Sequence, residues 1–100
     1  MNPLPVHKAG IAALCQRHYV KQLYAFGSAV KGDFNEGSDV DFIVDFAGVP
    51  EGSYVNNYFQ LKEALQQLLK RPVDLVEGEG IQNPYFLEAV NKEKQLIYGK

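Results

Sequence analysis

The chain has 100 residues, the usual size of one domain with a single hydrophobic core, and 46% of its residues are hydrophobic. Its one cysteine, Cys15, excludes an internal disulfide and a cysteine-based zinc site. The formal net charge of -2 leaves no basic surplus for a polyanion, which argues against nucleic acid as a partner.

The first ten residues, MNPLPVHKAG, lack the apolar segment of a signal peptide. No apolar run elsewhere approaches the roughly 20 residues that are needed to cross a bilayer. A lone cysteine also fits a reducing compartment. We therefore expect a cytoplasmic protein with no membrane partner.

The first half of the chain predicts one helix and two strands. Apolar side chains recur at helical spacing over residues 6–19, a helix that would include His7 and His18 as ordinary helix residues. Residues 20–26 are expected to form a strand, and residues 40–46, rich in β-branched and aromatic side chains, a second and well-buried one. Two glycines, a proline and a serine then predict a loop over residues 47–53.

The second half continues the alternation of helix and strand. Ser53 or Asn56 is expected to cap a helix that Lys70-Arg71-Pro72 ends, with apolar side chains at the helical period: Tyr58, Leu61, Leu65, Leu68 and Leu69. Further elements are expected over these ranges: a strand at 73–76, a turn at 77–82, a helix at 84–94 and a strand at 95–98. The order predicts one α/β domain over residues 1–100, a small mixed β-sheet with helices packed on it.

Two aspartates mark the beginning of the strand over residues 40–46. Side chains two residues apart in a strand point to the same face, so Asp39 and Asp41 lie side by side while Val40 and Phe42 face the core. Neighbouring carboxylates repel each other unless a cation lies between them. Mg²⁺ is the simplest such cation, because it prefers carboxylate, phosphate and water oxygens.

The turn before this strand supplies a complementary anion site. Gly27 and Ser28 end the preceding strand, and a turn of this kind offers backbone N–H groups and a hydroxyl to a phosphate. Ten residues separate Ser28 from Asp39, and Lys31 within this loop adds a positive charge. We therefore expect a nucleotide triphosphate to bind here, next to the metal.

Asp74, in the segment RPVDLV, supplies a third carboxylate. Nucleotidyl transfer depends on positioning and charge neutralisation, and activation of the attacking hydroxyl generally requires such a group. If the strand over residues 73–76 lies beside the strand over residues 40–46, Asp74 can join the same site. Asp45 shares the strand face of Asp41 but lies nearer the far end, and we do not assign it to the metal.

Together these motifs resemble the nucleotidyltransferase superfamily typified by DNA polymerase beta. More narrowly, the chain is similar to the minimal nucleotidyltransferases (MNT), which are encoded beside HEPN-domain toxins in bacteria and archaea. The matching residues are Gly27, Ser28, Gly32, Ser38, Asp39, Asp41 and Asp74.

The resemblance implies a nucleotidyltransferase fold and an antitoxin that is also an enzyme. It implies transfer of AMP from ATP to a hydroxyl, a tyrosine, of a partner HEPN toxin, which silences the toxin. The three aspartates would be catalytic and would hold Mg²⁺. The nucleotide would be bound by Gly27, Ser28, Lys31 and Ser38.

Two other functions stay open. Many relatives carry arginine directly after the Gly-Ser pair, where this sequence has Ala29. That difference favours a binding module that neutralises its toxin by contact, with a weakened nucleotide site. Nucleotidylation of a small molecule is a third possibility, against which the lack of a second, substrate-binding domain argues.

Overall fold

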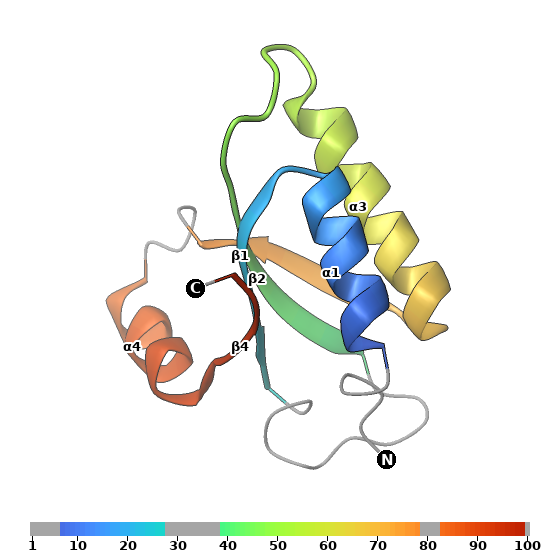
Figure 1. Cartoon of the computed structure of the whole chain (residues 1–100). Helices are drawn as coiled ribbons and strands as arrows, with labels where there is room; N and C mark the ends of the chain where they lie inside the picture. The colour runs from blue at the N-terminus through green and yellow to red at the C-terminus, as the bar shows by residue number, and fades with distance from the viewer. Residues whose placement is uncertain (1–6, 28–38, 79–82, 100) are drawn as a thin grey trace.

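The computed structural model describes residues 7–27, 39–78 and 83–99 (Figure 1). The helices and strands follow one another in the predicted order: α1 (Lys8–Arg17), β1 (Val20–Phe26), β2 (Val40–Phe46), α3 (Tyr54–Leu69), β3 (Val73–Glu77), α4 (Pro84–Glu93) and β4 (Gln95–Tyr98). Within these ranges, no helix is both long and apolar enough to span a membrane.

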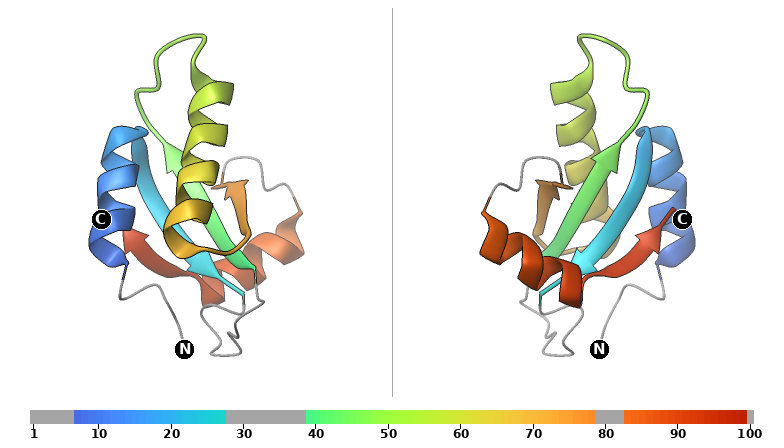
Figure 2. Two further views of the ribbon diagram at one scale, coloured as in Figure 1. Left: turned by 90° about the vertical axis from the view of Figure 1, so that its right-hand side faces the viewer. Right: turned by 90° about the vertical axis from the view of Figure 1, so that its left-hand side faces the viewer.

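The four strands form one mixed sheet in the order β3-β2-β1-β4. β1 pairs antiparallel with β2 and with β4, whereas β2 and β3 run parallel and are joined by the helical crossover through α3. Figure 1 shows α1 and α3 on one face of the sheet and α4 on the other, and Figure 2 shows the strands side by side. The predicted α/β fold with a small mixed sheet is therefore confirmed.

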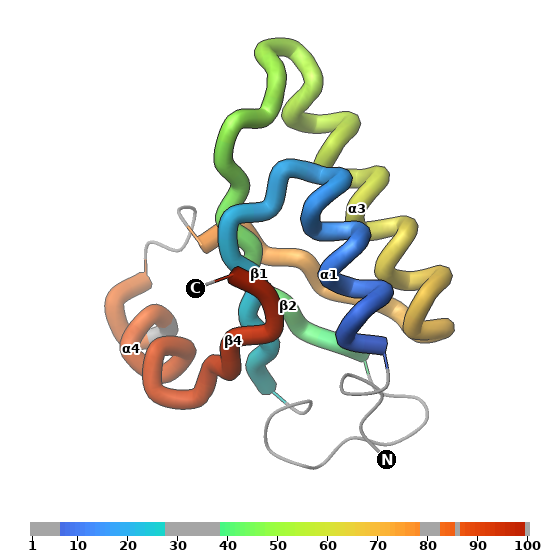
Figure 3. The backbone as a smooth tube through the Cα atoms, viewed as in Figure 1, coloured from blue at the N-terminus to red at the C-terminus, as the bar shows by residue number. Residues whose placement is uncertain are grey.

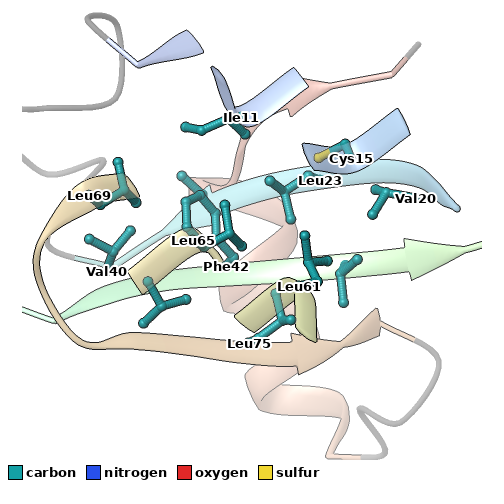
Figure 4. Close-up of a cluster of buried hydrophobic side chains, with 13 residues drawn as sticks. Ile11, Cys15, Val20, Leu23, Val40, Phe42, Leu61, Leu65, Leu69 and Leu75 are labelled. Atoms are coloured by element: carbon teal, nitrogen blue, oxygen red, sulfur yellow. The ribbon is translucent and has the colours of Figure 1, made fainter. Parts of the chain in front are cut away.

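The hydrophobic core lies between the sheet and the helices α1 and α3 (Figure 4). The two helices pack against each other along this face of the sheet (Figure 3). The buried side chains of the helices pack against alternate residues of the strands, as the alternation of Val40, Phe42 and Val44 in β2 predicts. The core includes these buried residues of both layers: Ile11, Cys15, Leu23, Val40, Phe42, Val44, Leu61 and Leu65. Burial raises the pKa of the Cys15 thiol to about 12, in keeping with a small hydrophobic residue.

The predicted ends of the first helix are wrong. α1 spans Lys8–Arg17, so His7 and His18 are its caps and not residues of its interior. The chain leaves the helix through Tyr19, which has a left-handed φ of 63°. The carbonyl of His18 accepts a hydrogen bond of 2.7 Å from Nδ2 of Asn57. A buried polar contact between α1 and α3 thus fixes this end of the helix.

The ends of α3 agree with the prediction, which gave Ser53 or Asn56 as its cap and Lys70 as its end. Ser53 occupies the N-cap position but makes no side-chain capping hydrogen bond, and Asn56 lies inside the helix. The helix ends at Leu69, because Lys70 adopts a left-handed φ of 56°. β3 then extends one residue beyond the predicted strand, to Glu77.

Leu65→Ala is expected to lower the free energy of unfolding by about 3 kcal/mol, because it leaves a cavity beneath the sheet. Leu65 is 0% exposed and belongs to the core cluster. Val55 lies on the same helix but is 65% exposed, so Val55→Ala should change stability by less than about 0.5 kcal/mol. Urea denaturation measures both values; equal losses would contradict the position of the core.

Candidate active site

Asp41 and Asp74 are register partners in the neighbouring parallel strands β2 and β3. Such strands lie about 4.8 Å apart, and the side chains of register partners point to the same face. That face is opposite the core, since Val40 and Phe42 on either side of Asp41 are buried beneath α1 and α3. The expected adjacency of the two strands is confirmed, and two carboxylates start from neighbouring positions on the α4 face.

Gly27 follows the last residue of β1 and lies beside the Asp41 carboxylate. Phe26, the last residue of β1, is the register partner of Asp41. Gly27 has a φ of 73°, and a Cβ at this position would lie 2.7 Å from Oδ2 of Asp41. Glycine therefore serves two purposes here: it adopts the left-handed turn without strain, and it leaves room for the Asp41 carboxylate.

The Asp41 carboxyl is in an unfavourable environment for negative charge. Burial is the largest cause that raises its pKa above the ordinary value, and the charges of Asp74 and Asp39 raise the pKa further. Asp39, directly before β2, and Asp74 are both exposed. The three acids thus share one electrostatic environment, which a cation would relieve.

The donor set fits a hard divalent cation, because all three groups offer carboxylate oxygens. Across residues 7–27, 39–78 and 83–99, no three acidic, histidine or cysteine side chains are already gathered as a complete metal-binding group. The strands bring the backbones of Asp41 and Asp74 together, and Asp39, two residues before Asp41, adds its charge. The assignment of these three acids as metal ligands stays a prediction.

Three of the predicted nucleotide-binding residues, Ser28, Lys31 and Ser38, lie outside the described residues. The residues that border this segment, Gly27 and Asp39, are described. Since the end of β1 pairs with the beginning of β2, these two residues lie at the end of the sheet that holds Asp41.

A cavity of about 370 Å³ lies on the same face, between α4 and the sheet. Strand residues Tyr24, Ile43 and Asp45 line it together with residues of α4. Nζ of Lys94 lies 4.2 Å from the centre of the Tyr24 ring. The sequence did not indicate this cavity, because its lining comes from segments that are far apart along the chain.

Two side chains of α3 reach the backbone of β3 on either side of Asp74. The hydroxyl of Tyr58 donates to the carbonyl of Leu75, and Oε1 of Gln66 accepts a hydrogen bond of 3.1 Å from the amide of Val73. Burial raises the pKa of Tyr58, and the charges of Asp74 and Glu77 raise it further. Sequence reasoning missed this contact, since the helical period marked Tyr58 only as an apolar position.

The fold and the arrangement of its acids match a known family. The family model described as a nucleotidyltransferase domain matches residues 8–97. The chain belongs to this family of nucleotidyltransferase enzymes.

Individual proteins agree with this assignment. MJ1379 of Methanocaldococcus jannaschii, whose name provisionally assigns it as a protein adenylyltransferase, is 36% identical over 87 residues, covering 85% of this chain and 82% of that protein. A solved structure, provisionally described as a minimal nucleotidyltransferase, matches with a TM-score of 0.75 and 34% identity, over 92% of this chain and 90% of its own.

A third match concerns the fold alone. The structure of a tri-AMPylated Shewanella oneidensis HEPN toxin in complex with MNT antitoxin has a TM-score of 0.67 at 19% identity. The match covers 97% of this chain and 73% of that one. The predicted resemblance to minimal nucleotidyltransferases is confirmed by the family match and by the 34% identical structure.

Proposed function

We propose that this enzyme transfers AMP from ATP, with Mg²⁺, to a tyrosine hydroxyl of a partner HEPN toxin and thereby acts as its antitoxin. The observation that carries the proposal is the register pairing of Asp41 with Asp74, beside the Gly27 turn. The name of the MJ1379 relative and the fold match to an MNT antitoxin in complex with an AMPylated HEPN toxin support the substrate and the partner.

The three acids take different parts in this reaction. Asp39, Asp41 and Asp74 would hold Mg²⁺, which when bound neutralises charge on the phosphates. The acceptor oxygen attacks the α-phosphorus of ATP, the bond to pyrophosphate breaks, and Asp74 accepts the hydroxyl proton. Gly27, Ser28, Lys31 and Ser38 would bind the phosphates through backbone amides, hydroxyls and one ammonium group.

Transfer is tested by incubating the chain with a HEPN partner, Mg²⁺ and ATP labelled on the α-phosphate. We expect label on the partner, and no label from ATP that is labelled on the γ-phosphate. Asp39→Asn should reduce labelling by roughly 10²-fold, since it removes one of the charges that hold the metal. Undiminished labelling by Asp39→Asn would contradict its role as a ligand.

Neutralisation of the toxin by contact is the second candidate. Ala29 stands where many relatives have an arginine, and α3 exposes the apolar side chains of Val55 (65%) and Phe59 (58%). The Asp39→Asn, Asp41→Asn double variant separates the two functions. If it still silences the toxin fully at a stoichiometric ratio, contact is sufficient; AMP transfer as the mechanism predicts that it does not.

A further inference from the structure

The outer edge of β3 needs hydrogen-bond partners from outside the sheet. Among the described strands, the order β3-β2-β1-β4 gives this strand one neighbour, β2. In a parallel ladder, alternate residues direct their backbone groups to the neighbouring strand and the others direct theirs away. The amide of Val40 donates to the carbonyl of Pro72 at 2.9 Å. The backbone groups of Pro72 and Asp74 therefore point toward β2, whereas the backbone N–H and C=O groups of Val73 and Leu75 point away from the sheet.

α3 provides partners for two of these outward groups. Gln66 bonds the amide of Val73 at 3.1 Å, and Tyr58 bonds the carbonyl of Leu75. The two contacts come from one helix, whose side chains Leu61 and Leu65 are fully buried in the core. The backbone on each side of Asp74 is thus hydrogen-bonded to α3, a helix that is anchored in the core.

We propose that Tyr58 and Gln66 are positioning residues for Asp74. By holding the outward groups of its two neighbours, they fix β3 against β2 and keep the Asp74 carboxylate beside Asp41. The inference rests on the proposed function, because that function gives Asp74 its part in the reaction. A displacement of about 1 Å at a reacting group can reduce a rate by about 10²-fold, so small movements of this strand matter.

Tyr58→Phe tests the first contact, since it removes the hydroxyl and keeps the ring that packs against the core. We expect kcat for AMP transfer to fall about tenfold and KM for ATP to stay within about twofold. Tyr54→Phe is the matched control: it removes a hydroxyl from the same helix, one that donates to Oε2 of Glu77 at 2.6 Å. It should leave both constants within about twofold.

Gln66 is tested by a pair of variants. Gln66→Met keeps the length of the side chain but removes the acceptor, and kcat should fall by a similar factor to that in Tyr58→Phe. Gln66→Glu restores an acceptor oxygen for the Val73 amide and should recover most of the lost rate. A side chain needed only for packing would not show this recovery.

Wild type and Asp74→Asn are measured in the same assay, so that two failures can be told apart. If Asp74→Asn is inactive but Tyr58→Phe and Gln66→Met keep the wild-type kcat, the positioning inference is overturned and the proposed function stands. If the wild type transfers no AMP, the proposed function fails. In that case, the rate of hydrogen exchange at the Asp74 amide tests the positioning inference without an activity assay. Faster exchange in Tyr58→Phe than in Tyr54→Phe supports the inference, and equal exchange rates overturn it.

Discussion

Asp41→Asn is expected to reduce AMP transfer by on the order of 10³-fold while raising the thermal stability of the protein. The activity falls because the variant removes the carboxylate at the centre of the three acids. The stability rises because burial and the charges of Asp74 and Asp39 all oppose ionisation of Asp41. A gain in stability together with a loss of function is typical of a site that concentrates like charges.

The raised pKa of Asp41 predicts how the stability of the protein changes with pH. Its folded pKa is raised above the ordinary value of 3.8, so the folded protein binds this proton more tightly than the unfolded chain does. The stabilisation by the proton is fully present below the unfolded pKa and is lost as pH rises through the folded pKa. The Tm of Asp41→Asn should therefore exceed that of wild type by an amount that grows from acidic to neutral pH.

Asp45→Asn is the matched control for Asp41→Asn. Asp45 lies on the same face of β2, toward its far end, where it lines the cavity beside α4. We expect this variant to keep the wild-type rate of transfer. Equal rates in Asp41→Asn and Asp45→Asn would contradict the assignment of the site to this end of the strand.

Gly27→Ala is expected to reduce transfer by about 10²-fold, because the new methyl group displaces the Asp41 carboxylate. Its Cβ would lie 2.7 Å from Oδ2 of Asp41, closer than the two atoms can approach. The left-handed φ of 73° adds a cost of about 1 kcal/mol to the free energy of folding. Alanine keeps the backbone N–H, so the loss cannot be attributed to a missing donor for phosphate.

Gly48→Ala separates these two effects. Gly48 has a similar φ of 79°, but a Cβ there would meet no atom within 4 Å. Both variants should therefore lose about 1 kcal/mol of stability in urea denaturation, whereas only Gly27→Ala should lose activity in the labelled-ATP assay. Full activity in Gly27→Ala would show that the contact with Asp41 is unimportant.

Much of the fold could be predicted because its signals are local. The strands β1, β2 and β4 have the predicted bounds, since alternating or β-branched residues stand between turn-forming residues. The ends of α3 were predicted as well, at Ser53 and Lys70. The ends of α1 were placed too far out, because the chain leaves this helix through its C-cap His18 and the left-handed Tyr19. Tyrosine does not normally mark a left-handed position, so packing between elements decides this end of α1.

The candidate site could be predicted only in part, for a similar reason. Asp39 and Asp41 are two residues apart, so strand geometry predicts a shared face, but β2 itself begins at Val40, one residue after Asp39. The placement of Asp74 beside Asp41 depended on which strands pair, and the parallel register supplies that fact. Tyr58 and Gln66 act on β3 from another element, through contacts that no periodic pattern in the sequence encodes.

The most direct measurement is paramagnetic broadening of backbone amide signals by Mn²⁺, in the presence of a non-hydrolysable ATP analogue. If Asp41 and Asp74 hold one metal beside the Gly27 turn, the amide signals of these three residues should broaden first and together. The broadening should disappear in Asp41→Asn, and the signal of Glu63, on α3 across the sheet, should stay sharp. Broadening that reaches Asp41 but spares Asp74, or that persists in Asp41→Asn, would contradict a shared metal site.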